Sequence, residues 1–146
     1  MSFIGSIEDR LAIREFYDAF AYVSSVGDKE EWLSMWADGC RWKTYLFNLT
    51  GKDELSEQWD ALWANFDKAS LLCNVGSIEV AGDQAEVKMV VREQIKLKSG
   101  GIMKQAGSYQ DKLVKEQGRW LLSCRVYEKI LEEVPKNFAS STEGSN

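Results

Sequence analysis

The stretch GSYQDKLVKEQGRWLLSCR, residues 107–125, decides the fold of this chain. Tyr109, Asp111 and Leu113 recur at every second position, which is the period of a strand with one buried face. Gly118 supplies a turn, and a second alternating run follows it. In that run we expect Trp120, Leu122, Cys124 and Val126 to face inward and Arg119, Ser123 and Arg125 to face outward. The stretch therefore predicts an antiparallel hairpin.

Asp111 is the unusual residue of this hairpin, because it shares a strand face with an aromatic and an apolar side chain. A buried carboxylate needs hydrogen-bond partners. Asp111 either bonds a neighbouring arginine or backbone group, or lines a pocket. Both interpretations are open at the level of sequence.

Length and charge exclude several classes of protein. The chain has 146 residues and a mass of 16.6 kDa, which is the size of one domain. Its net charge of -5 and its lack of a basic stripe argue against nucleic-acid binding. The uncharged stretches, residues 45–51 among them, are too short to span a membrane, and the N-terminus does not resemble a signal peptide. We therefore expect a cytoplasmic protein without membrane or nucleic-acid partners.

The reactive side chains are limited as well. Histidine is absent, which excludes a Ser-His-Asp triad and histidine metal ligands, so we expect neither metal nor cofactor. The spacing of Cys40, Cys73 and Cys124 fits no disulfide framework or zinc site, so we expect buried free thiols. Aromatic residues make up 12% of the chain, with six tryptophans. Such rings pack cores, but they also line cavities for flat apolar ligands.

The chain divides into a helical half and a strand half. Ser6 precedes a long helical pattern that ends at Gly27, Asp28 caps a second helix, and Gly51 opens a third. From Leu71 onward the period is two. We expect strands over residues 40–46, 71–80, 84–97 and the two limbs of the final hairpin. The pattern predicts an α+β fold with helices packed on an antiparallel sheet, a single domain over residues 1–137 and a disordered tail over residues 138–146.

Several motifs in this order resemble the nuclear transport factor 2-like superfamily, and more narrowly its SnoaL-like branch. The resemblance implies a cystatin-like cone, in which a curved antiparallel sheet wraps around three N-terminal helices and leaves a pocket. It also implies a homodimer formed through the outer face of the sheet. Members use the pocket for dehydration, isomerisation, cyclisation or binding alone. The matching features are Tyr17, the block from Gly27 to Trp42, Gly51, Asn74, Gly82-Asp83 and the final hairpin.

Acid–base enzymes that resemble scytalone dehydratase carry an aspartate and a histidine at two places where this chain has serines. Those places hold Ser24 or Ser25, and Ser70. The departure argues against chemistry by a His-Asp dyad.

A second resemblance is to the small (beta) subunits of aromatic-ring-hydroxylating dioxygenases, through residues 31–42 and 107–135. It implies a non-catalytic subunit that carries no iron and assembles with a large oxygenase subunit.

Four residues are candidates for catalysis. Glu93 alternates with apolar residues on its strand, so burial would raise its pKa and suit it to act as a general base. The alternatives for Glu93 are an ion pair with a cross-strand Arg or Lys, and a strand end that is open to water. Asp111, Tyr109 and Tyr17 complete the set, the tyrosines as hydrogen-bond donors or acids or as ordinary core residues.

Four further residues are candidates for ligand binding. Trp42, Tyr45 and Trp63 either stack on a flat ligand or simply pack. Asn74 lies on the strand side of Leu72, where its amide bonds a ligand carbonyl or the backbone. Together these residues predict a pocket for a small hydrophobic aromatic or polycyclic ligand, with metal-free acid–base catalysis of the dehydratase, isomerase or cyclase type, or with binding alone.

Overall fold

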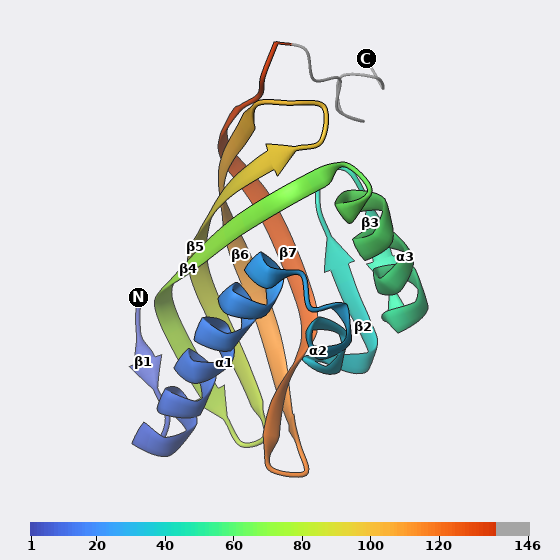
Figure 1. Cartoon of the computed structure of the whole chain (residues 1–146). Coiled ribbons are helices and arrows are strands. Elements are labelled where there is room, and N and C mark those ends of the chain that lie inside the picture. The colour runs from blue at the N-terminus through green and yellow to red at the C-terminus, as the bar shows by residue number, and fades with distance from the viewer. Residues whose placement is uncertain (137–146) are drawn as a thin grey trace.

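The computed structural model describes residues 1–136, so the predicted tail at residues 138–146 lies outside the described residues. Helices dominate the first half and long strands the second, as expected. Figure 1 shows the strands as a strongly curved sheet, with α1 lying across its concave side. The elements are β1 (Phe3–Ile4), α1 (Ile7–Val26), α2 (Lys29–Ser34), β2 (Trp36–Lys43), β3 (Asn48–Thr50), α3 (Gly51–Trp63), β4 (Phe66–Ala81), β5 (Gln84–Leu97), β6 (Ile102–Glu116) and β7 (Arg119–Glu133).

The helix boundaries follow from their capping residues. The Ser6 hydroxyl accepts a hydrogen bond from the Asp9 backbone N–H at 3.0 Å, and Gly27 ends α1 in the left-handed conformation. Asp28 caps α2 by accepting from the Glu31 N–H at 3.1 Å. The three predicted helices are therefore confirmed. The α1 residues that face the sheet are buried, namely Ile13, Tyr17, Phe20 and Val23.

The sheet has seven strands in the order β1-β4-β5-β6-β7-β2-β3. The four long strands β4 to β7 form the predicted antiparallel meander. The sheet as a whole is mixed, because β1 pairs with β4 and β2 pairs with β7 in parallel. The sequence did not predict the short strands β1 and β3, nor that β4 begins at Phe66 instead of Leu71.

Two irregularities in strand pairing reverse the expected side-chain orientation. The register shifts at Gly76 of β4, so that Leu71 and Cys73 face inward before the shift and Ile78 faces inward after it. Asn74 is therefore exposed on the outer face, and its predicted inward orientation is wrong. A single extra residue in a strand exchanges its two faces.

The second irregularity lies in β7, where Ser123 has no register partner between Leu122 and Cys124. The side chains that follow Ser123 therefore point to the opposite face of the sheet from the one that strict alternation predicts. Arg125 is fully buried, which corrects the expectation that it faces solvent. Tyr127 faces inward with it.

Most buried side chains belong to one core between α1 and the sheet. A smaller cluster around Ile95, Leu97 and Met103 lies near the turn between β5 and β6. No helix within residues 1–136 has the length and apolar character needed to cross a membrane.

Candidate functional site

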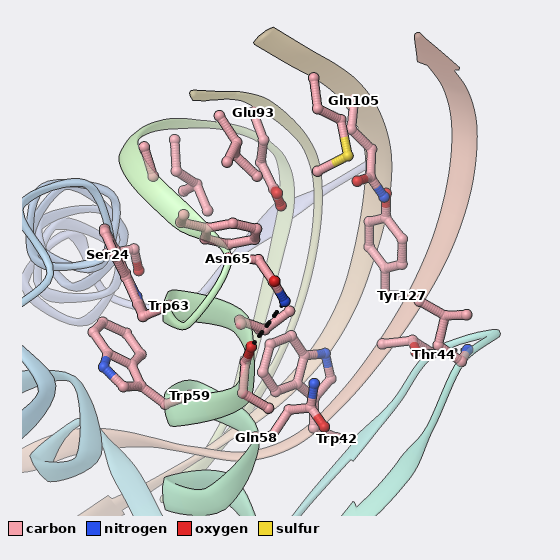
Figure 2. A pocket seen from close by; sticks show the side chains of 18 of the residues that line it. Ser24, Trp42, Thr44, Gln58, Trp59, Trp63, Asn65, Glu93, Gln105 and Tyr127 are labelled. Carbon is pink, nitrogen blue, oxygen red and sulfur yellow. Dashed lines mark hydrogen bonds between the residues drawn. The ribbon is translucent and has the colours of Figure 1, made fainter. Parts of the chain in front are cut away.

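A cavity of about 490 Å³ opens between the concave face of the sheet, α3 and the connection from β2 to β3 (Figure 2). Its volume lies within the range of roughly 300–1,000 Å³ typical of small-molecule sites. Apolar and aromatic side chains form most of its wall. The larger ones are Phe20, Trp32, Trp42, Tyr45, Leu46, Phe47, Trp59, Leu62, Trp63, Phe66, Leu71, Ile95, Met103, Tyr109 and Tyr127.

Four tryptophan side chains pack against one another along one side of the cavity. The ring centre of Trp32 lies 4.8 Å from that of Trp59 and 6.0 Å from that of Trp42, and Trp59 lies 5.6 Å from Trp63. Trp42, Trp63 and Tyr45 were predicted to contact a ligand, and all three line the cavity. These residues therefore pack against one another and also present ring surface to the cavity.

Glu93 is one of two acids that line this cavity, the other being Glu132. The Glu93 side chain projects from β5, and the surface that it keeps accessible opens into the cavity (Figure 2). Within residues 1–136 it makes no hydrogen bond or ion pair, so the predicted alternative of a cross-strand ion pair is not found. Burial raises the pKa of Glu93 to about 7, against a weaker opposing effect of the Arg125 charge. The carboxyl is therefore able to gain or lose a proton near neutral pH.

Asp111 and Tyr17 lie behind the cavity wall, in a buried charged cluster. Both Asp111 carboxylate oxygens accept from Arg125, from Nε at 2.9 Å and from Nη2 at 2.7 Å. The Tyr17 hydroxyl donates to Asp111 Oδ2 at 2.7 Å. Side chains of Asp111 and Arg125 are fully buried. Of the two interpretations of Asp111, the structure supports the bond to a neighbouring arginine.

Tyr109 connects the cluster to the cavity. Its ring lines the cavity and stacks on the Arg125 guanidinium, whose carbon lies 3.6 Å from the ring centre. Phe20 covers the same guanidinium at 4.5 Å. Burial raises the pKa of Tyr109 well above its usual value, so this phenol stays protonated. Among the four predicted catalytic residues, the structure therefore brings Glu93 and Tyr109 to the cavity.

Two cavity residues, Gln105 and Tyr127, were not predicted from the sequence. The Gln105 side-chain amide donates to the Tyr127 hydroxyl at 2.5 Å. Gln105 lies directly across from Glu93 in the β5–β6 register, and Tyr127 belongs to β7. The sequence-based prediction missed Tyr127 because of the irregularity at Ser123, since strict alternation from Trp120 places residue 127 on the outer face.

The two serine positions noted in the sequence also reach the cavity. Ser24 and Ser70 both line it, whereas Ser25 accepts a hydrogen bond from the Leu71 N–H at 2.8 Å. The Ser24 hydroxyl oxygen and the Trp42 indole N–H are buried without a hydrogen-bond partner in the described part of the chain. Asn74, predicted as a ligand-binding residue, does not line the cavity.

A family model described as a SnoaL-like domain matches residues 5–126. The chain belongs to the SnoaL-like family, a branch of the nuclear transport factor 2-like superfamily. The cone of curved sheet and N-terminal helices expected from the resemblance is thereby confirmed. A comparison of this SnoaL-like protein with curated proteins found no match.

Solved structures share this fold at low sequence identity. One is a provisionally named scytalone dehydratase from Novosphingobium aromaticivorans, with a TM-score of 0.81 at 21% identity, covering 92% of this chain and 97% of the other. Another, from the same organism, is provisionally named an aromatic ring hydroxylase, with a TM-score of 0.82 at 20% identity and coverage of 87% and 92%. The structure of LinA has a TM-score of 0.79 at 18% identity, with coverage of 92% and 95%. At such identities the likeness establishes the fold of this SnoaL-like protein.

Proposed function

We propose that this SnoaL-like protein binds a hydrophobic aromatic or polycyclic metabolite in its cavity and that Glu93 transfers a proton to or from it. The reaction would be of the dehydratase, isomerase or cyclase type, without a metal or cofactor. The observation that carries the proposal is one carboxyl, with a pKa of about 7, facing an aromatic-walled cavity without a protein partner.

The wall of the cavity supports the ligand part of the proposal. Ring surfaces of Trp42, Trp59 and Trp63 suit a flat apolar molecule, because aromatic pairs gain free energy from stacking beyond the area they bury. Ser24 and Trp42 also line the cavity, and their hydroxyl and indole N–H have no hydrogen-bond partner among the described residues.

Glu93 supports the catalytic part. A general base or acid works best when its pKa is near the working pH. Tyr109, which lines the same cavity, stays protonated and can act as a hydrogen-bond donor there. Asp111 takes no direct part in this proposal, because its oxygens are engaged by Arg125 and Tyr17.

The test is a panel of hydrophobic ring compounds, screened for binding by tryptophan fluorescence and for conversion by mass spectrometry. Glu93→Gln should retain binding and lose conversion by about 100-fold or more, since a positioned acid or base contributes roughly 10²–10⁴-fold. Wild-type activity should change through an apparent pKa near 7. The matched control is Glu86→Gln, an exposed glutamate on the outer face of the same strand. Wild-type turnover by Glu93→Gln would refute the catalytic role.

A second candidate function is a non-catalytic small subunit of an aromatic-ring-hydroxylating dioxygenase. One observation favours it, namely the structural neighbour named as an aromatic ring hydroxylase. Co-purification of an iron–sulfur large subunit from the native source, followed by native mass spectrometry, tests this candidate. A protein that converts ring compounds alone would contradict it.

A further inference from the structure

Three neighbouring strands place a row of polar side chains across the concave face of the sheet. Glu93 of β5 is the register partner of Gln105 of β6, so their Cβ atoms lie about 4.5–5.5 Å apart. Gln105 in turn reaches Tyr127 of β7 with its amide. All three line the cavity, on the side opposite α3 with its Trp59 (Figure 2).

Tyr127 is held in one position from several directions. Its ring packs over Gly107, where any side chain would collide with it. Tyr109 meets the ring edge-on at 5.7 Å, and Tyr45 lies 6.3 Å from it. The hydroxyl oxygen accepts from Gln105 at 2.5 Å.

The hydroxyl hydrogen of Tyr127 is left for another partner. A phenol donates one hydrogen bond in addition to those it accepts. The hydrogen bonds of residues 1–136 include none in which Tyr127 is the donor. Burial raises the pKa of Tyr127, so the group keeps its proton across the neutral range. A fixed, protonated donor thus faces the cavity close to Glu93.

The charges around the cavity restrict what can accept this hydrogen bond. Its lining contains two carboxylates, Glu93 and Glu132, and neither lysine nor arginine among the described residues. Arg125 lies behind Tyr109 and is neutralised by Asp111. An anionic ligand would therefore lose its hydration without meeting a compensating positive charge.

We propose that Tyr127, positioned by Gln105, donates a hydrogen bond to an uncharged oxygen of the ligand, and that the cavity selects neutral ketones or phenols of ring compounds over carboxylates. The inference rests on the proposed function, because it names the class of ligand for the same cavity. Trp59 and Trp63 would contact the ring system of the ligand. The opposite wall of the cavity, formed by β5, β6 and β7, would contact the ligand oxygen.

Three naphthalenes that carry different groups at the same ring position test this inference by titration calorimetry at pH 8. Acetylnaphthalene offers a neutral carbonyl, naphthoate replaces it by a carboxylate, and isopropenylnaphthalene has the same shape without oxygen. We expect acetylnaphthalene to bind about tenfold or more tightly than naphthoate, since an unpaired charge is costly to desolvate. Glu93→Gln should narrow that difference by strengthening the binding of naphthoate.

Tyr127→Phe isolates the hydrogen bond. It should weaken acetylnaphthalene binding by about fivefold, the value of one neutral hydrogen bond, and leave isopropenylnaphthalene binding unchanged. Gln105→Leu should also weaken acetylnaphthalene binding, but add little in the Tyr127→Phe background, because both changes remove the same positioned donor. Tyr22→Phe, at an exposed residue of α1, is the matched control and should change neither affinity.

The outcomes separate the inference from the proposed function. If acetylnaphthalene binds and Tyr127→Phe leaves its affinity unchanged, or if naphthoate binds as tightly, the inference is overturned while an aromatic ligand site remains. If none of the three naphthalenes binds the wild-type protein, the inference and the aromatic ligand site fail together.

Discussion

At the scale of single residues, Glu93 links stability to pH. In an unfolded chain this carboxyl titrates near 4.5, whereas in the folded protein its pKa is about 7 because burial disfavours the charged form. The folded state therefore holds more protons between these two values, and stability falls as pH rises through that window. Above pH 7 the effect is constant. Glu93→Gln should flatten this slope and stabilise the protein at pH 8 by about 1–3 kcal/mol.

Urea unfolding at pH 5 and at pH 8 measures this prediction. Glu86→Gln is the control, because Glu86 is exposed on the outer face of β5 and should leave the slope as in the wild type. An unchanged pH dependence in Glu93→Gln would mean that Glu93 titrates as an ordinary surface acid.

Asp111 is expected to increase the free energy of unfolding of the protein. Arg125 is fully buried and held by both Asp111 oxygens, so Asp111→Asn would leave a buried cation without its counter-charge. Breaking a buried pair from one side costs about 3–5 kcal/mol. We expect the free energy of unfolding to fall by that amount, measured by urea denaturation.

The control for Asp111 is Asp60→Asn, which removes the partner of Lys29 in an exposed ion pair and should hardly change stability. Replacing both Asp111 and Arg125 by leucine should recover part of the loss, since no buried charge then remains unpaired. If the Asp111→Asn protein were stable but lost turnover, we would instead infer that Asp111 takes part in catalysis.

At the scale of elements, regular periodicity in the sequence was sufficient to predict that the helices and the four long strands exist. The caps Ser6 and Asp28 fixed the helix starts, and alternation placed Glu93 on the inner face of β5. Prediction failed beyond the irregularities in β4 and β7, because one unpaired residue exchanges the two faces of a strand. Asn74 and Arg125 were misplaced for this reason. Nothing in the local sequence marks Ser123 as an irregularity.

Gly107 of β6 gives the element-scale prediction. Its φ angle is ordinary, but a Cβ atom there would overlap the Tyr127 ring. Gly107→Ala should push Tyr127 away from Gln105 and lower the free energy of unfolding by about 1–3 kcal/mol, as overpacking does. Thermal unfolding measures the loss, and calorimetry with acetylnaphthalene measures the displaced donor.

The matched control on the same strand is Ser108→Ala, whose side chain points to the other face of the sheet. It should change neither stability nor binding appreciably. If Gly107→Ala behaved like Ser108→Ala, the close approach of Tyr127 to β6 would be disproved.

At the scale of the whole molecule, the curvature of the sheet separates two surfaces with different uses. The concave face holds α1 (Figure 1). The cavity opens on the same face. The outer face leaves apolar side chains in solvent, including Leu72 at 66% exposure and Val90 at 39%. Val90 is the register partner of Asn74, so the misplaced Asn74 belongs to this outer surface. We propose that two copies associate through the outer face as a homodimer.

Leu72→Asp tests this association. A carboxylate in the middle of an apolar contact loses hydration without a partner, so the variant should shift the native mass from dimer to monomer. Its affinity for acetylnaphthalene should stay at the wild-type value, because the cavity lies on the opposite face of β4. Leu11→Asp, at an exposed leucine of α1 away from the outer face, is the control and should leave the mass unchanged. A wild-type protein that is monomeric at micromolar concentration would refute the dimer directly.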